Sequence, residues 1–141
     1  MITNVRLATK HDAEELSRLN QVFNGGNRRL ASEIIESLNK SNELIAVAAL
    51  SDKIVGFACA QSFESFCYQE LQGEITEMYV EEAARRRGIA ASLISFLEDK
   101  LQARGVKYVK VLTGRKNHVA IKTYERCNYV QDDELLLHKK L

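Results

Sequence analysis

Residues 85–90 read Arg85-Arg86-Arg87-Gly88-Ile89-Ala90 and lie between an expected strand and an expected helix. The preceding stretch, Glu74 to Val80, is rich in apolar and β-branched residues, which predicts a strand. Behind the turn, apolar residues recur every four positions and predict one face of a helix: Ile89, Leu93, Leu97 and Leu101. The free N–H groups and the positive dipole end of a first helical turn attract anions. Gly88 allows close backbone approach and the arginines add positive charge, so the segment predicts a diphosphate-binding turn.

An arginine-rich turn of this kind is compatible with several types of segment. Three consecutive arginines before a helix are often only a solvated loop. An ATPase phosphate loop requires Lys-Ser/Thr after Gly88, where Ile89-Ala90 stand, and a dinucleotide fingerprint requires three glycines where this turn has one. The pattern that remains is Arg/Gln-x-x-Gly-x-Gly/Ala.

A second motif follows in the same order and at a similar distance as in one known family. It reads Asn117-x-x-Ala120-x-x-x-Tyr124 and is followed by Cys127-Asn128-Tyr129. With both motifs, the chain resembles the GCN5-related N-acetyltransferase (GNAT) superfamily, by motif over residues 73–130 and by element order over residues 1–72. The stretch Glu74 to Val80 is also similar to small aminoglycoside 3-N-acetyltransferases. The resemblance implies transfer of an acetyl group from acetyl-CoA to a primary amine, by direct attack in a ternary complex.

The expected architecture is an α/β fold, a GNAT-like single N-acetyltransferase domain over residues 1–141 with a mixed sheet of six to seven strands and about four helices. The expected strands are residues 5–8, 44–50, 53–62, 74–80, 108–113 and 135–141, and the expected helices are 9–23, 30–38, 88–104 and 118–126. Ser51-Asp52 is expected to join two of the strands as a hairpin, and Thr9-x-x-Asp12 resembles a capping box at the first helix. By resemblance, the parallel strands 74–80 and 108–113 splay apart and hold the pantetheine arm of CoA.

Acetyl transfer requires a base that deprotonates the amine and a donor that protonates the departing thiolate. The resemblance assigns the acid to Tyr124, whose alternative role is a core aromatic. Glu77 is the preferred base and Glu74 its rival, and either carboxylate is otherwise a solvated or salt-bridged residue. Because their separation is odd, Glu74 and Glu77 are expected on opposite faces of the strand.

The resemblance also implies which residues contact acetyl-CoA. Asn117 either caps a helix or holds the pantetheine carbonyl. The full expected set is Met78, Tyr79, Val80, Arg85, Arg86, Arg87, Gly88, Ile89, Ala90, Ala91, Asn117, Ala120 and Tyr124.

Composition narrows the function classes. The 141 residues carry a formal net charge of +1, which does not favour nucleic acid or an anionic membrane as a partner. No run of about 20 apolar residues occurs, and the start lacks an apolar signal core. The three cysteines lack metal-type spacing, so we expect no metal and reduced thiols in a cytoplasm. The sequence does not decide between a monomer and a homodimer.

The acceptor is predicted from acidic segments. The loop from Phe63 to Gly73 mixes aromatic and acidic residues, and Glu64 and Glu70 lie within it. Together with Glu74 and Glu77 they predict a pocket for a small cationic amine, such as an aminoglycoside or a polyamine. A protein lysine or N-terminus is an alternative acceptor, and a non-catalytic acyl-CoA-binding sensor is an alternative function.

Overall fold

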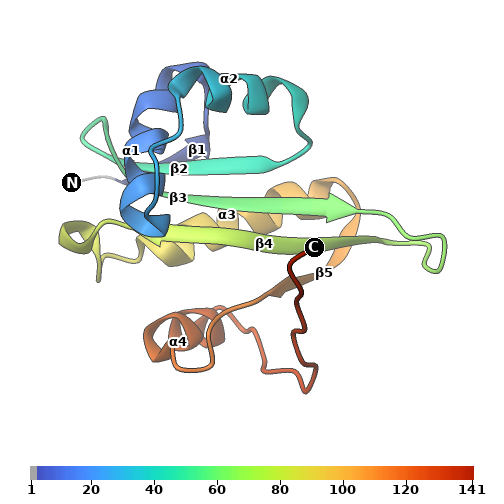
Figure 1. Ribbon diagram of the computed structural model, residues 1–141. Coiled ribbons are helices and arrows are strands. Elements are labelled where there is room, and N and C mark those ends of the chain that lie inside the picture. Colours follow the sequence, from blue (N-terminus) through green and yellow to red (C-terminus); the bar gives the residue numbers. More distant parts are fainter. Residues whose placement is uncertain (1–2) are drawn as a thin grey trace.

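A mixed five-stranded sheet is the centre of the computed structural model, which describes residues 3–141. The pairs β1–β2, β2–β3 and β3–β4 are antiparallel, whereas the pair β4–β5 is parallel (Figure 1). The order in the sheet follows the chain: β1 (Thr3–Leu7), β2 (Leu44–Leu50), β3 (Lys53–Phe63), β4 (Leu71–Val80) and β5 (Val106–Val111).

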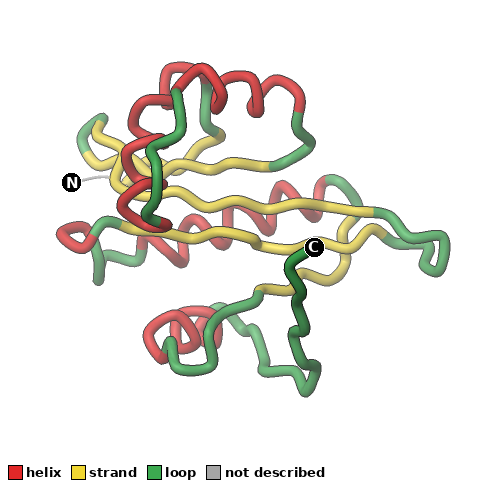
Figure 2. Tube along the Cα trace, viewed as in Figure 1, coloured by secondary structure: helices red, strands yellow, loops and turns green. Residues whose placement is uncertain are grey.

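Helices lie on both faces of this sheet, as Figure 2 shows. Helices α1 (Ala13–Asn24) and α2 (Ala31–Lys40) cover one face, and α3 (Ile89–Ala103) covers the other. Helix α4 (His118–Arg126) follows β5, and two short 3-10 turns, η1 (Lys10–Asp12) and η2 (Glu82–Ala84), precede α1 and α3. None of the helices in residues 3–141 has the length and apolarity that crossing a membrane requires.

The two faces have separate hydrophobic cores. The predicted apolar stripe of α3 is confirmed, because all four of its residues are buried against the sheet. On the other face, Leu16 and Leu19 of α1 pack on Val47 and Phe57. Burial of such side chains contributes roughly 1.5–3 kcal/mol each, so these two layers fix the positions of α1 and α3.

Local sequence features explain several of the boundaries. Ser51 and Asp52 both have positive φ, at 49° and 67°, as the two-residue turn of the predicted β2–β3 hairpin requires. The expected capping box is present, because Asp12 Oδ2 accepts from the Thr9 N–H at 2.8 Å and the His11 N–H donates to Thr9 Oγ1 at 3.3 Å. Gly105, with a φ of 98°, follows the end of α3.

A β-bulge in β4 corrects the expectation that Glu74 and Glu77 face opposite sides. Cys59 of β3 lies opposite Glu77, but the next residue, Ala60, lies opposite Ile75, so Thr76 is an extra residue in β4. The extra residue shifts the alternation of side chains by one. Glu74 and Glu77 therefore lie on the same face, the one covered by α1 and α2.

The parallel pair β4–β5 is hydrogen-bonded over only part of β4. Residues Leu71–Ile75 pair with residues Val106–Val111, and β4 then continues to Val80 with no strand partner on that side among residues 3–141. The second half of β4 is thus paired with β3 as its one strand neighbour in the described chain. On the β5 side the Val80 carbonyl accepts from Arg85 Nε, and the other backbone groups of this half are left for another partner.

The expected closing strand at residues 135–141 is wrong, and the sheet has five strands instead of six to seven. A strand requires a hydrogen-bonded neighbour for its backbone groups, and residues 135–141 pair with no strand of the described chain, although the outer edge of β5 is open. Other boundaries shift by a few residues, since β4 begins at Leu71 and β5 at Val106.

Candidate active site

The turn before α3 has the backbone geometry that the sequence predicts for an anion site. Arg86 and Gly88 have positive φ, at 66° and 75°, and no side chain caps the helix. Within residues 3–141, the N–H groups of residues 86–91 make no hydrogen bond. A Cβ placed on Gly88 would meet nothing within 4 Å, so the space in front of these N–H groups is open.

The three arginines of the turn divide into two kinds. Arg85 is engaged with β4, because its Nε donates to the Val80 carbonyl at 2.8 Å and its guanidinium lies 5.9 Å from the centroid of the Tyr79 ring. Arg86 and Arg87 are exposed and, in the described chain, form no ion pair. These two are the side chains available to a bound anion.

The unpaired half of β4 leads from this turn into the sheet. Its backbone has no β5 partner after Ile75, and Thr76 Oγ1 is buried without a hydrogen-bond partner among the described residues. Unpaired buried polar groups are costly unless a ligand satisfies them. A linear ligand with amide groups and a diphosphate fits both features, and coenzyme A has that chemistry.

Tyr124 of α4 is buried, with 7% of its surface exposed, and belongs to the core on the α3 side. Burial raises the pKa of its phenol to about 12, so the hydroxyl stays protonated at neutral pH. The ring stacks edge-on with Tyr129 at 5.6 Å, and the Tyr129 hydroxyl donates to Glu98 at 2.8 Å. No hydrogen bond holds the Tyr124 hydroxyl in the described residues, which leaves its proton for a ligand.

Asn117 and Ala120 form the start of α4. The Oδ1 atom of Asn117 accepts from the Ala120 N–H at 3.2 Å, which confirms the capping interpretation. Contact of either residue with the cofactor stays a prediction.

The two carboxylates predicted as bases have different surroundings. Glu74 lies 3.8 Å from the ammonium of Lys110, its neighbour across the β4–β5 pair. Glu77 is half-buried and has no ion-pair partner within residues 3–141. Of the two carboxylates, only that of Glu74 is engaged by a lysine, and the role of Glu77 as the base stays a prediction.

Glu43 is a residue that sequence reasoning missed. It lines a recess of about 140 Å³ between α1, α2 and the sheet, together with Leu16, Asn20, Arg29, Ile34, Ser37, Ile45, Phe57 and Cys59. Burial raises the pKa of Glu43 and the nearby charge of Glu77 adds to the effect, whereas the Cys59 thiol acts in the opposite direction. Burial likewise raises the pKa of Cys59, which stays a thiol.

No sequence pattern distinguishes Glu43 from a solvated loop residue. It precedes β2 directly, and only the pairing of β2 with β3 and of β3 with β4 places it near Glu77. Such a contact between strands distant in sequence has no local signature.

The predicted acidic loop does not contribute to this recess. Glu64 and Glu70 lie in the exposed loop between β3 and β4, which projects beyond the end of the sheet (Figure 1). Neither residue lines the recess, whose acidic lining residue is Glu43, and Glu77 lies near enough for its charge to act on Glu43. In the described chain no cluster of His, Cys, Asp or Glu side chains forms a metal site.

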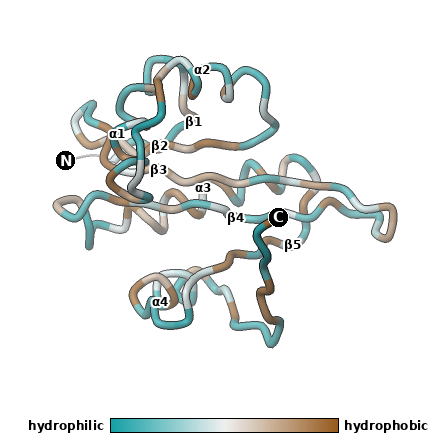
Figure 3. The backbone as a smooth tube through the Cα atoms, viewed as in Figure 1, coloured by the Kyte–Doolittle hydropathy of each residue, from teal (hydrophilic) through white to brown (hydrophobic). Residues whose placement is uncertain are grey.

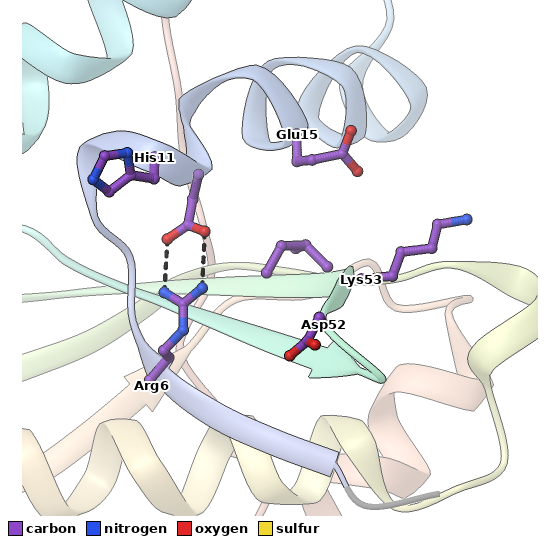
Figure 4. Close-up of a pocket in the computed structure, with 7 residues that line it drawn as sticks. Arg6, His11, Glu15, Asp52 and Lys53 are labelled. Atoms are coloured by element: carbon purple, nitrogen blue, oxygen red, sulfur yellow. Dashed lines mark hydrogen bonds and ion pairs between the residues drawn. The ribbon is translucent and has the colours of Figure 1, made fainter.

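A larger recess of about 410 Å³ lies elsewhere, between η1 and the β2–β3 turn (Figure 4). Its main charges neutralise each other, because Arg6 binds Asp12 through two hydrogen bonds of 2.7 and 2.9 Å. None of the predicted catalytic or cofactor-binding residues lines it. We assign it a structural role, joining the end of β1 to the start of α1.

Comparison with known proteins agrees with the motifs. The acetyltransferase (GNAT) family matches over residues 12–129. An acetyltransferase of Yersinia enterocolitica is 34% identical over 109 residues, which are 77% of this chain and 73% of that protein.

Two solved structures share the fold. One is an aminoglycoside acetyltransferase from an uncultured soil metagenomic sample, in complex with trehalose, with a TM-score of 0.87 and 18% identity over 99% of this chain and 96% of that one. The other is AAC(6')-Iy in complex with a CoA-containing bisubstrate analogue, also with a TM-score of 0.87 and 18% identity, over 100% of this chain and 99% of that one. At these identities the likeness concerns the fold alone.

Proposed function

Because the chain belongs to the acetyltransferase (GNAT) family, and is thus an acetyl-CoA-dependent N-acetyltransferase, we propose that it acetylates a primary amine of a small cationic molecule. An aminoglycoside or a polyamine has the required chemistry. The observation that carries the proposal is the pair Glu43 and Glu77, two carboxylates without a cationic partner in the described chain, on the face of the sheet that holds the recess.

The proposed cofactor site combines the turn and the open half of β4. The diphosphate binds the free N–H groups of residues 86–91, with Arg86 and Arg87 at its sides. The pantetheine amides pair with β4 from Thr76 to Val80, where no β5 partner exists. Acetyl-CoA supplies an activated thioester there, and its attack by a neutral amine yields an amide and a free thiol.

The proposed proton transfers use both faces of the sheet. Glu77, on the recess side, accepts the proton that the ammonium must lose before attack. Tyr124, on the α3 side, donates its proton to the departing sulfur, because a phenol with a pKa of about 12 is still protonated at neutral pH.

Glu43 has a binding role in this proposal. It lines the recess on the face of the sheet that also carries Glu77, so it attracts a second cationic group of the acceptor. A bound cation lowers the raised pKa of Glu43 again, because an opposite charge favours the ionised form.

The testing experiment is a thiol-release assay with aminoglycosides, polyamines, a basic peptide, single amino acids and an anionic phosphosugar amine. We expect polyamines or aminoglycosides to give the highest kcat/KM, and acceptors with two amines to exceed those with one. Preference for the anionic amine would refute the cationic acceptor, and preference for the peptide would favour a protein substrate. Tight acetyl-CoA binding without turnover would favour the sensor function.

A further inference from the structure

Helix α1 contacts two different regions of the molecule. Figure 3 shows hydrophobic and hydrophilic residues in turn along it, which is typical of a helix with one buried face. Its Leu16 and Asn20 line the recess that also holds Glu43. Its Arg18 and Phe23 instead reach the end of β4, from which the chain leads into the turn before α3. The helix therefore borders both the proposed acceptor recess and the proposed cofactor turn.

An ion pair joins α1 to the segment that leads into this turn. The guanidinium of Arg18 lies 2.8 Å from Glu81 Oε1 and 2.9 Å from Glu15 Oε2, so it links its own helix to the first residue after β4. The Glu81 side chain is only 18% exposed, so salt screens this pair less than a fully exposed one. Among residues 3–141, no other side chain of α1 forms a hydrogen bond with β4 or with residues 81–88.

Glu81 is also held by its backbone. Its N–H donates to the Val55 carbonyl of β3 at 2.8 Å, and its carbonyl accepts from the Ala84 N–H at 2.9 Å, within η2. The N–H of Arg85 then donates to the Glu82 carbonyl at 3.2 Å. The stretch from Glu81 to Arg85 is therefore held by hydrogen bonds, and the free N–H groups of the turn follow it directly.

An aromatic contact connects the same helix to the same turn. The Phe23 ring of α1 stacks on the Tyr79 ring of β4, with centroids 5.2 Å apart, and the Arg85 guanidinium lies over that Tyr79 ring. Stacked rings attract each other, and so do a cation and the face of a ring. One polar and one aromatic contact thus fix the turn relative to α1.

We propose that the Arg18–Glu81 ion pair positions the turn before α3 for acetyl-CoA, which makes both of them positioning residues of the cofactor site. The proposal rests on the proposed function, in which the diphosphate binds the free N–H groups of this turn. A turn that is held in place before the ligand arrives loses less conformational freedom on binding, so the pair should increase the affinity. Because α1 also lines the recess, the pair fixes the cofactor turn relative to the proposed acceptor site.

Two neighbouring carboxylates allow a test in which charge and positioning have opposite effects. Glu81 and Glu82 both precede the arginines of the turn, but Glu82 is exposed and has no ion-pair partner among residues 3–141. By charge alone, removal of either carboxylate should strengthen acetyl-CoA binding or leave it unchanged. Glu81→Ala should instead weaken it, about 3- to 10-fold in calorimetric titration, the range expected for one partly exposed ion pair. Glu82→Ala is the matched control and should not weaken it.

A double-mutant cycle tests whether Glu81 acts through Arg18. Arg18→Met should weaken binding as Glu81→Ala does, and the variant with both changes should bind about as well as either single variant, because one change already breaks the pair. Glu15→Ala should leave the affinity unchanged, since Glu15 pairs with Arg18 within the helix. Additive losses, stronger binding in Glu81→Ala, or an equal loss in Glu15→Ala or Glu82→Ala would overturn the proposal.

Two further measurements separate the positioning role from fold stability and from the cofactor site itself. Urea unfolding compares the stability of the variants, and a lowered midpoint with unchanged acetyl-CoA affinity would make the pair purely structural. In the native protein, acetyl-CoA should protect the amides of residues 86–91 from hydrogen exchange. Protection there, with unchanged affinity in Glu81→Ala, would refute the positioning role alone. Absence of protection would refute the proposed cofactor site and the positioning role with it.

Discussion

At the scale of single residues, a buried carboxylate (Asp12) and a half-buried one (Glu43) have pKa values shifted in opposite directions. Asp12 is buried, but its hydrogen bonds from Arg6 hold its pKa below the usual value. Glu43 has no ion pair in residues 3–141, so its pKa rises, mainly through desolvation. The ionised Asp12 carboxylate stabilises the folded state. The ionised Glu43 carboxylate destabilises it, but is available to a ligand.

Replacing Glu43 by Gln should therefore weaken binding of the acceptor while it raises the stability of the fold. We expect KM for a diamine to rise about tenfold, while kcat changes little, because Glu43 binds the second cation and leaves the reacting amine to Glu77. Because the folded-state pKa of Glu43 is raised, its ionised form destabilises the fold at neutral pH, and Gln should raise the urea midpoint.

A matched variant and a pH series check the binding role of Glu43. Glu64→Gln, in the exposed β3–β4 loop, should change neither KM nor the urea midpoint. In the native protein, KM for diamines should increase as the pH falls through the raised pKa of Glu43, and this dependence should be absent in Glu43→Gln. An unchanged KM together with a reduced kcat would instead assign Glu43 to proton transfer.

Tyr124→Phe removes one hydroxyl and preserves the packing of the ring. If the phenol protonates the departing sulfur, kcat should fall roughly 10²- to 10⁴-fold with little change in thermal stability. Tyr129→Phe is the matched control, because that hydroxyl donates to Glu98. Its loss should lower the free energy of unfolding by about 1–2 kcal/mol and leave kcat near the native value. Full turnover in Tyr124→Phe would make Tyr124 a purely structural residue.

Asp12→Asn should lower the free energy of unfolding at neutral pH, and should also make that free energy less dependent on pH in the acidic range. The lowered pKa of Asp12 means that its stabilisation is present above the unfolded-state pKa of about 4 and is lost as pH falls through the folded-state pKa. At pH 7 we expect a loss of about 2–3 kcal/mol, for hydrogen bonds to a charged partner. Urea unfolding at pH 7 and pH 3 measures this, and the difference between native protein and variant should shrink at pH 3.

At the scale of elements, the turn and α3 act as one anion-binding unit. Gly88→Asp adds a negative side chain where the N–H groups of residues 86–91 are free, at a φ of 75° that favours glycine. We expect acetyl-CoA affinity to fall at least about 100-fold in calorimetric titration, through the combined loss of space and charge. Gly26→Asp is a control for strain, since Gly26 has the same φ and lies away from the turn. Unchanged affinity in Gly88→Asp would remove the site from this turn.

The elements that the sequence predicts well are those determined by local pattern. The α3 stripe, the Ser51-Asp52 hairpin and the Thr9 cap follow from spacing and backbone preference, and all three are present. The sequence predicts poorly the features that depend on residues distant in the chain. The bulge at Thr76 arises from the register with β3, and the leucine run at residues 135–137 has strand character but no strand neighbour in the described chain. The recess around Glu43 likewise depends on four separate elements.

At the scale of the whole molecule, acetyl-CoA bound along β4 should stabilise the folded state of the chain. The open half of β4 and the free end of α3 belong to the two elements that border the α3-side core. Acetyl-CoA at 100 times its dissociation constant should stabilise the folded state by about 2.7 kcal/mol, equivalent to a rise of about 5–10 °C in Tm for a chain of this size. Scanning calorimetry with acetyl-CoA, and with free pantetheine as a comparison, measures the effect. No shift with saturating acetyl-CoA would contradict this coupling.

The extra residue in β4 also limits how the chain can change in length. Deleting Thr76 would remove the bulge and leave Ile75 opposite Ala60 and Glu77 opposite Cys59, so both halves of the strand would keep their faces. An insertion between Glu77 and Met78 would instead turn the end of the strand over and carry Met78 out of the apolar layer beneath α3. The exposed loop at residues 64–70 has no such constraint, because added residues there leave both strands in register. Variants that gain residues should therefore survive selection in that loop and be eliminated in the second half of β4.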